Sequence, residues 1–275
     1  GRTGDNCLLA TKVAVPIDGP ARENVGLLGS PAFEIPREVA NRQRFDPLAE
    51  TPAAQAQLAE KHRFNLRTIG CHLVADWLLV LAFLRVGATG GVLYPVIGWA
   101  AVALGFALLP VVVFLHGIAS EWFGHVGIRI KPAACTIHER YYWWIERHWK
   151  FSETFLNYAC PGTPFRPMVM RLLGLKVGRK VFDDGSSIPE KQLVEIGDGA
   201  TINAQVIIQG HSLEDGLYKA DRIRIGAGAT LAPCSFVHYG AEMEPGSVLD
   251  ADSFMMKGAR STAGTRWRGN PARLG

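Results

Sequence analysis

Bulky apolar residues recur at six-residue intervals in the C-terminal part of the chain. The positions with this spacing are Ile196, Ile202 and Ile208, then Ile225, Leu231, Val237, Met243, Leu249 and Met255, with Val177 as an outlying first member. A small or β-branched residue stands four positions after each of them, at Val181, Ala200, Val206, Ser212, Ala229, Ser235, Ala241, Ser247, Ser253 and Ala259. One inward residue per hexad is typical of a hexapeptide β-helix, in which each hexad supplies a short strand and a corner. The pattern predicts a mainly β domain over residues 173–275, a parallel β-helix of about four coils.

A similar spacing occurs near the start of the chain. The residues that follow it are Thr3, Leu9 and Val15. In addition, the Gly-Ser-Pro-Ala sequence at 29–32 matches the Gly-Asn-Pro-Ala sequence at 269–272, which closes the main repeat region. We therefore expect residues 1–33 to be the last coils and tail of a preceding β-helix, and the chain to be a fragment of a longer tandem protein.

Two long apolar runs lie between the repeat regions. Thr68–Leu84 is interrupted by His72 and Asp76, whereas Val92–Leu115 carries no charge. About 20 apolar residues cross a bilayer as a helix, so the runs predict an α-helical transmembrane hairpin over residues 66–120. Three glycines are expected to form the turn between the two helices: Gly87, Gly90 and Gly91. A buried helical hairpin inside a soluble core is the alternative interpretation.

The charges beside the apolar runs predict the orientation of the hairpin. The flanking basic residues are Lys61, Arg63 and Arg67 before the first run, and Arg129 and Lys131 after the second. Positive charges favour the cytoplasmic side of a membrane. We therefore expect an inner-membrane, multi-pass protein in contact with the lipid bilayer, with the β-helix on the cytoplasmic side.

Two segments connect these parts. Residues 34–65 are polar and are interpreted as a linker, with an Ala- and Gln-rich helix over residues 52–61. Residues 121–172 form a second linker, and its Tyr- and Trp-rich segment Tyr141–Trp149 is typical of a helix at the membrane interface. The alternative is that this helix packs against the base of the β-helix.

Composition excludes several functions. The net charge of +4 is modest and its basic residues are scattered, so no nucleic-acid partner is expected. The five cysteines show no paired spacing, which argues against a disulfide framework and fits a reducing cytoplasm. No metal site is predicted either, because six histidines lack the spacing of metal ligands: His62, His72, His116, His125, His138 and His148.

The six-residue pattern breaks between Ile208 and Ile225, which are 17 positions apart, so a loop must leave the β-helix there. A protruding loop beside a neighbouring β-helix is a means by which this fold forms a pocket. The loop carries His211, and a histidine suits the removal of a proton from an attacking amine or hydroxyl. Glu214 or Asp215 would hold its other ring nitrogen. A surface histidine without a catalytic role is the alternative.

A second histidine of interest is His238. It follows the inward residue Val237, so its side chain is expected to point out of the β-helix. It then either lines the same groove as His211 or is a solvated strand residue.

The hexads, the Gln-Gly-His sequence at 209–211 and the terminal Trp-Arg-Gly-Asn-Pro-Ala-Arg sequence at 267–273 resemble hexapeptide-repeat acyltransferases of the galactoside, maltose and serine acetyltransferase type. The resemblance implies a left-handed β-helix that binds acyl-CoA in a groove between adjacent β-helices. It also implies a catalytic His, which this chain keeps with a Leu-acid pair after it, while the usual proline is lost. Residues near the groove are then expected to meet the pantetheine or phosphate of the donor, with a solvated side chain as the alternative for each: Lys257, Asn270 and Arg273.

The wider arrangement resembles the C-terminal region of membrane-bound nonribosomal peptide synthetases similar to epsilon-poly-lysine synthetase. The matching features include Gly162-Thr163-Pro164-Phe165, Arg171-Leu172-Leu173-Gly174 and the loop sequence at 209–215. The resemblance implies adenylation and carrier domains before three tandem repeats, which form an intramolecular pseudo-trimer. It implies that an acyl or aminoacyl group passes from a phosphopantetheine thioester, on a carrier protein or CoA, to a small amine such as an amino acid. No covalently bound cofactor is expected in this region.

Two other functions are compatible with the sequence. One is an acetyl-CoA-dependent O- or N-acetyltransferase, for which an isolated short gene would be typical. The other is a catalytically inert β-helix that serves as a scaffold repeat, for which tolerance of substitutions in the loop is expected.

Overall fold

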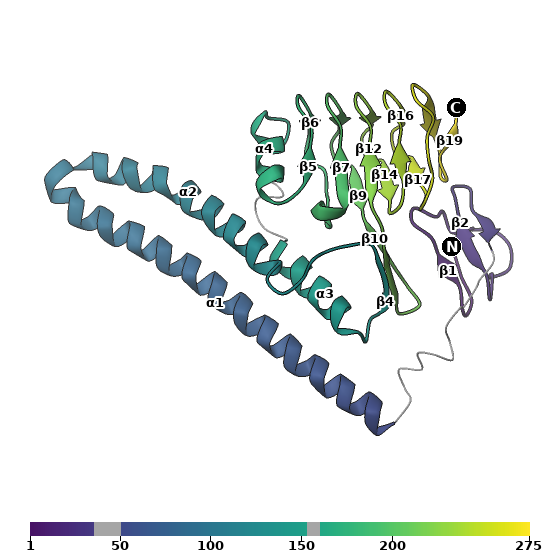
Figure 1. Ribbon diagram of the computed structural model, residues 1–275, viewed down its shortest axis with the longest axis horizontal. Helices are drawn as coiled ribbons and strands as arrows, with labels where there is room; N and C mark the ends of the chain where they lie inside the picture. Colours follow the sequence, from purple (N-terminus) through teal and green to yellow (C-terminus); the bar gives the residue numbers. More distant parts are fainter. Residues whose placement is uncertain (36–50, 153–159) are drawn as a thin grey trace. The chain divides into compact units, whose positions relative to one another are not determined.

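The structure is a computed structural model that describes residues 1–35, 51–152 and 160–275 (Figure 1). It consists of two compact units. The repeat unit contains the N-terminal segment, Ile130–Thr136 and Cys160–Gly275, and the helical unit contains Leu48–Arg129 and Ile137–Ala159.

The β-helix of the repeat unit stacks short parallel strands in three sheets, and the antiparallel strand β19 ends the second of them. The first sheet holds β5 (Lys176–Val177), β7 (Val194–Ile196), β12 (Ile223–Ile225) and β15 (Glu242–Met243). The second holds β6 (Phe182–Asp183), β8 (Thr201–Ile202), β13 (Thr230–Leu231), β16 (Val248–Leu249), β18 (Arg266–Arg268) and β19 (Arg273–Leu274). The third holds β9 (Ile207–Gln209), β14 (Phe236–His238) and β17 (Phe254–Met255). Successive coils thus supply one strand to each sheet in turn, as the predicted β-helix requires.

The pairing register places the six-residue pattern inside the stack. Ile225 lies opposite Ile196 on one side and Met243 on the other, and Leu231 lies between Ile202 and Leu249 in the same way. From Ile196 to Met255, the apolar residues of the pattern are at most 3% exposed. Full burial of one such side chain contributes about 1.5–3 kcal/mol, so the stacked column is the main source of stability. The parallel β-helix predicted from the periodicity is confirmed.

Two insertions, rather than the single predicted break, leave the regular coils. The expected one forms the hairpin of β10 (His211–Glu214) and β11 (Leu217–Ala220), which is extended by antiparallel pairing with β4 (Ala133–Thr136). The second lies in the first coil, where the short 3₁₀-helix η2 (Lys191–Leu193) interrupts the step towards Ile196. It was missed because Val177 alone represents the pattern before that point. α4 (Phe165–Leu172) precedes the first coil.

The N-terminal segment has the strand pairing of a β-helix end. β1 (Leu8–Leu9) pairs in parallel with β2 (Gly26–Leu28), with Leu9 opposite Leu27. β2 then pairs antiparallel with β3 (Phe33–Ile35), as β18 does with β19 at the other end of the chain. The segment thus contains one coil-like parallel pair followed by a terminal hairpin.

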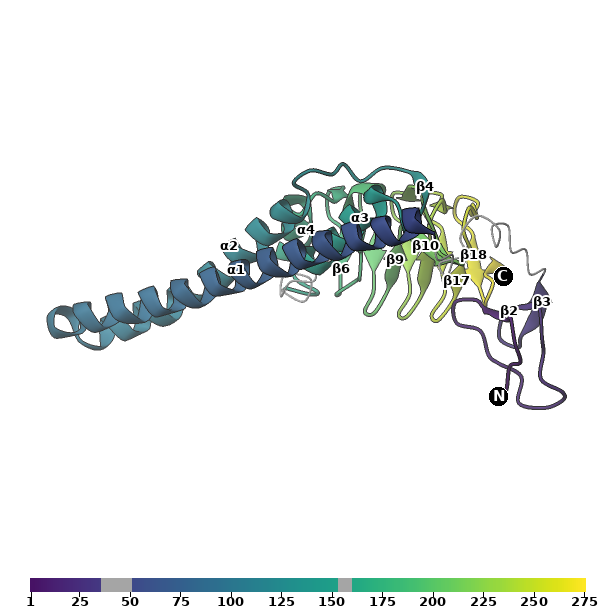
Figure 2. The same cartoon turned by 90° about the horizontal axis from the view of Figure 1, so that it is seen from below.

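The helical unit contains α1 (Pro52–Ile97), α2 (Trp99–Gly124) and α3 (Arg140–Ser152). α1 and α2 lie side by side in Figures 1 and 2. α1 begins beside Thr51, whose hydroxyl accepts a hydrogen bond from the Ala54 N–H. Both helices are long and apolar enough to cross a membrane, and the apolar windows are 0% and 11% buried within the structure.

The predicted position of the hairpin turn was wrong. α1 continues through Gly87, Gly90 and Gly91, and the chain reverses at Gly98, where φ is 56° and ψ is −134°. A glycine inside a helix costs only about 1 kcal/mol relative to alanine, so three glycines do not oblige a helix to end. Gly98 instead adopts a left-handed φ that residues with a Cβ avoid.

α3 contains the aromatic segment and is helical, as predicted. Tyr142, Trp143 and Phe151 are buried, and they contact the neighbouring helices of the same unit. The ring centroids of Phe64 on α1 and Trp143 are 6.0 Å apart, and those of Phe123 on α2 and Phe151 are 5.1 Å apart. The helix thus packs on the end of the α1–α2 hairpin through its aromatic face.

Leu231→Ala should strongly destabilise the β-helix. Leu231 is fully buried between Ile202 and Leu249, so its truncation leaves a cavity that costs about 2–5 kcal/mol. We expect a clear fall in the temperature of thermal unfolding. The matched control is Thr230→Ala on the same strand, where the side chain is only partly buried and the change should be small. Equal effects of the two variants would contradict the assignment of the inward face.

Candidate functional site

The side chain of His211 is held by a buried carboxylate. Its Nδ1 lies 2.8 Å from Glu190 Oε1, and the Glu190 side chain is fully buried. The other carboxylate oxygen, Oε2, accepts a hydrogen bond of 3.0 Å from the Gly210 N–H. A carboxylate at this distance from Nδ1 favours a proton on that nitrogen, which in the neutral ring leaves the lone pair on Nε2.

The two insertions bring this pair together. Glu190 belongs to the η2 insertion of the first coil, and His211 begins the β10–β11 hairpin of the next. The parallel bridge between Ser187 and Ile207 fixes these two coils against each other just before both insertions start. Gly210 permits the close approach, since a Cβ there would lie 3.1 Å from Glu190 Oε2.

Tyr218 supports the His211 ring from the opposite strand of the hairpin. The two rings are stacked, with centroids 5.7 Å apart and planes inclined by 26°. Tyr218 is fully buried, and the His211 side chain is 14% exposed. The imidazole is therefore fixed in one orientation while part of it reaches the surface.

The six-residue pattern did not point to Glu190, and Glu214 or Asp215 was expected to hold the second ring nitrogen of His211. Glu214 lies on β10 and faces Lys257, with Nζ 3.5 Å from Oε2. Asp215 occupies the hairpin turn with a φ of 50°. The structure places neither of them against Nδ1. The available signal for Glu190 was the 19-residue step from Val177 to Ile196, which is not a multiple of six.

His238 lies beside the hairpin and is directed outward from β14, as expected. It is nevertheless only 7% exposed, which excludes the alternative of a solvated strand residue. Its Nε2 lies 3.0 Å from the backbone carbonyl of His211, an acceptor, so Nε2 carries the proton. Burial lowers the pKa of His238 below its ordinary value, and the bond to the His211 carbonyl only partly opposes that effect. His238 is therefore neutral near pH 7.

A cavity of about 230 Å³ opens next to His238. It lies between the N-terminal segment and the outer face of the third sheet. Its polar lining residues are Thr11, Gln209, Ser212, Glu214, His238 and Lys257, and the apolar ones include Leu9, Leu28, Phe254 and Met256. The cavity thus combines an apolar wall with one carboxylate, one ammonium and one imidazole.

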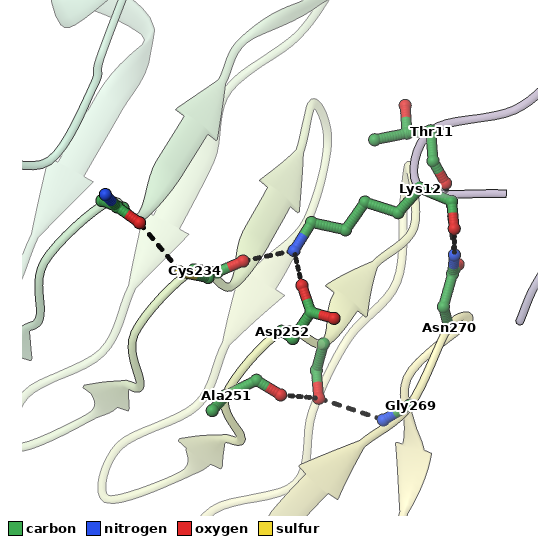
Figure 3. A network of polar contacts seen from close by, with 9 residues as sticks. Thr11, Lys12, Cys234, Ala251, Asp252, Gly269 and Asn270 are labelled. Atoms are coloured by element: carbon green, nitrogen blue, oxygen red, sulfur yellow. Dashed lines mark hydrogen bonds and ion pairs between the residues drawn. The ribbon is translucent and has the colours of Figure 1, made fainter. Parts of the chain in front are cut away.

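The N-terminal segment is fastened to the β-helix by a polar network (Figure 3). Lys12 Nζ lies 2.6 Å from Asp252 Oδ1 and also donates to the Cys234 carbonyl. The Asn270 amide donates to the carbonyls of Thr11 and Lys12, at 3.2 and 2.7 Å. The N-terminal segment also contributes Leu28, which packs on Phe236 and Phe254 of the β-helix in a buried cluster.

Of the three residues expected to meet a donor, only Lys257 lines the cavity. The Asn270 amide donates its hydrogen bonds to backbone carbonyls of the N-terminal segment, so it binds that segment to the β-helix. Arg273 is exposed on β19 and is not a lining residue of the cavity. Lys257, Asn270 and Arg273 thus do not line this cavity together.

His238 should make the protein less stable in acid. Because its pKa is lowered in the folded state, the unfolded chain binds more protons once the pH falls below about 6.5. Above that pH the titration of His238 does not lower the free energy of unfolding. As the pH falls from about 6.5 towards the pKa of His238 in the folded state, the free energy of unfolding decreases. His238→Gln removes the titration, so the unfolding temperature of this variant should fall less than that of the wild type between about pH 7.5 and pH 5. Parallel pH curves for the two proteins would contradict the buried neutral state.

Comparison with known proteins gives one extensive sequence match. The chain is 27% identical over 276 aligned residues, 98% of its length, to Delta-poly-L-ornithine synthetase of Acinetobacter baumannii (strain AB307-0294). The chain spans only 20% of the length of that protein. No family model matches.

Several solved hexapeptide-repeat proteins resemble parts of the chain. Galactoside acetyltransferase in complex with coenzyme A is 19% identical, with a TM-score of 0.35, covering 44% of this chain and 74% of that one. A maltose O-acetyltransferase from Clostridium difficile 630 is 13% identical, with a TM-score of 0.35 and coverages of 52% and 91%. A hexapeptide transferase family protein from Anaplasma phagocytophilum is 25% identical, with a TM-score of 0.29 and coverages of 36% and 53%. The sequence match extends much further, and the chain is thus similar over nearly its whole length to a poly-amino-acid synthetase, which confirms the resemblance predicted from its motifs.

Proposed function

We propose that this chain carries out acyl or aminoacyl transfer from a phosphopantetheine thioester to an amine, forming an amide bond. The observation that carries the proposal is the Glu190–His211 pair, in which a fully buried carboxylate holds Nδ1 of a partly exposed imidazole at 2.8 Å. A similar arrangement of carboxylate and imidazole serves general-base catalysis in many enzymes. The similarity to a poly-ornithine synthetase supports amide formation as the reaction.

In the proposed reaction, the amine nitrogen attacks the thioester carbonyl carbon while His211 Nε2 accepts a proton from that nitrogen. The carbon–oxygen double bond opens to an oxyanion and then re-forms as the carbon–sulfur bond breaks. The departing thiolate takes the proton from the imidazolium, which restores the neutral His211. Glu190 stabilises the transient positive charge on the ring and keeps the tautomer fixed.

The donor is a thioester on a carrier protein or on CoA, and the acceptor is a small amine such as an amino acid. We assign the cavity beside His238 to part of this substrate path. Its volume of about 230 Å³ is below the roughly 300–1,000 Å³ of common ligand pockets, so it suits a narrow arm or a small side chain. Lys257 and Glu214 supply opposite charges at its rim. Asn270 is proposed to act indirectly, by fastening the segment that forms the opposite wall.

We propose that the β-helix is left-handed and that it assembles with sister repeats of the same protein as a pseudo-trimer. The N-terminal segment supports this arrangement, because its parallel pair and terminal hairpin have the pairing found at the C-terminal end of the chain. On this proposal the segment is the end of a preceding repeat. A catalytic groove would then lie where one repeat meets the next.

We further propose that α1 and α2 span the inner membrane as a hairpin with the β-helix on the cytoplasmic side. At 1.5 Å per residue α1 is about 69 Å long and α2 about 39 Å, and both exceed the roughly 30 Å of a hydrocarbon core. The uncovered apolar side chains of both helices support a lipid environment. The polar start of α1, with Lys61 and Arg63, would extend into the cytoplasm.

His211→Ala and Glu190→Gln test the proposed chemistry. Product formation by the full-length protein should fall by about 10²- to 10⁴-fold in His211→Ala, because a positioned base contributes that factor. Glu190→Gln should lower kcat less severely, since Nε2 remains while the tautomer is no longer fixed. Both variants should still load the amino acid as a thioester, which is measured separately.

Asp215→Asn is the matched control for these variants. Asp215 lies in the hairpin turn, where asparagine tolerates the same left-handed φ, so activity should stay close to that of the wild type. Unchanged product in His211→Ala would refute the proposed base and favour an inert scaffold repeat. Transfer of an acetyl group from free acetyl-CoA, without any need for a carrier-bound aminoacyl thioester, would instead favour the O- or N-acetyltransferase.

Cysteine labelling tests the membrane hairpin. In a variant whose five native cysteines are replaced by serine, Trp99→Cys marks the tip beside Gly98, and Lys61→Cys marks the start of α1. In intact cells a membrane-impermeant maleimide should label position 99 and leave position 61 unlabelled until the membrane is permeabilised. Labelling of position 61 alone in intact cells would reverse the orientation, and equal protection of both positions would contradict a spanning hairpin.

A further inference from the structure

A cluster of potential metal ligands lies at the junction of α2 and α3 in the helical unit. Glu121 stands near the end of α2, His125 is the residue that caps it, and His148 projects from α3. One carboxylate oxygen and one nitrogen of each imidazole all lie within 4.8 Å of one another. This group is separate from the Glu190–His211 pair, which belongs to the repeat unit.

Burial makes the cluster unlike a chance group of surface residues. Glu121 and His148 are both 0% exposed, although glutamate is among the residues most rarely buried completely. A buried carboxylate is stable only when hydrogen-bonded, paired with positive charge or coordinated to a cation. Placing two imidazoles beside it supplies two further ligands that suit a transition-metal ion.

His125 is held in the tautomer that metal binding through Nε2 requires. Its Nδ1 lies 2.8 Å from the backbone carbonyl of Glu121, an acceptor, so Nδ1 bears the hydrogen and Nε2 has the lone pair. In metal-binding histidines, the N–H of the second ring nitrogen usually donates a hydrogen bond to a carbonyl or carboxylate in this way.

The packing around His148 leaves room for its ring. Gly124 lies against it, and a Cβ at that position would be 3.2 Å from His148 Nδ1. The ring centroids of His125 and His148 are 4.3 Å apart, with planes inclined by 48°. The contact between Phe123 and Phe151 holds α2 and α3 together next to the cluster.

We propose that Glu121, His125 and His148 form a binding site for a divalent transition-metal ion of the zinc class. Two imidazole nitrogens and one carboxylate oxygen are a common three-residue set for Zn²⁺, with ligand bonds of about 2.0–2.2 Å. With bonds of this length, the ligand atoms of a tetrahedral site lie about 3.3 Å from one another. Since the three ligand atoms here lie within 4.8 Å of one another, side-chain shifts of about 1–1.5 Å would bring them to that separation. The bound ion would join α3 to the end of α2.

Metal binding to the full-length protein, purified in detergent and freed of metal by a chelator, tests this site. Wild type should bind one more equivalent of Zn²⁺ than His148→Gln, measured by elemental analysis after removal of excess ion. The variant should lose more affinity than the roughly 10- to 100-fold that follows removal of a residue that only hydrogen-bonds a metal ligand. Zn²⁺ should also raise the temperature of unfolding of the wild type, since it binds the folded state.

The matched control is His62→Gln, an exposed histidine on α1 outside the cluster, which should retain the wild-type stoichiometry. Co²⁺ gives a second readout that uses the wild type alone and therefore does not require a folded variant. Co²⁺ bound in tetrahedral geometry by two nitrogens and an oxygen should produce an intense visible absorption. Zn²⁺ should abolish that absorption by displacement. Equal Zn²⁺ content in wild type and His148→Gln, or a wild-type Co²⁺ spectrum identical to that of the aqueous ion, would overturn the proposal.

Discussion

The stacking of one inward apolar residue per hexad is the interaction on which the repeat unit depends. Its strands are only two to four residues long, too short to be stable individually. They persist because each inward residue, such as Ile225 or Leu231, is buried between its counterparts in the coils before and after. Extra residues therefore fit only where the chain leaves the coil, and the proposed base His211 and its carboxylate partner Glu190 both lie in such insertions.

The same stacking explains how the proposed base acquires its partner. Glu190 and His211 are 21 positions apart in the sequence, but they belong to insertions in consecutive coils. Parallel register places the starts of those insertions beside each other, and Gly210 lets the backbone approach the buried carboxylate. Rigid coils thus provide a fixed scaffold for a side chain that protrudes from them.

A cavity forms on the outer face of the third sheet because the N-terminal segment covers that face. Phe236, His238 and Phe254 point away from the core, yet the N-terminal segment covers them and leaves a cavity beside His238. Lys12 and Asn270 secure that segment by contacts with backbone carbonyls and with Asp252. The local environment that lowers the pKa of His238 is therefore created by contacts between distant parts of the chain.

The sequence alone determined the features that depend on local periodicity: the β-helix, the departure of the hairpin that carries His211, the two apolar helices and the aromatic helix. It did not reveal Glu190, the burial of His238, the turn at Gly98 or the grouping of Glu121 with His148. Those features depend on coil register, helix packing and backbone conformation, which the spacing of residues does not encode. Six-residue spacing identifies which side chains face the core, but only the tertiary structure decides which outward or inserted side chains meet, because those contacts join residues that are remote in sequence.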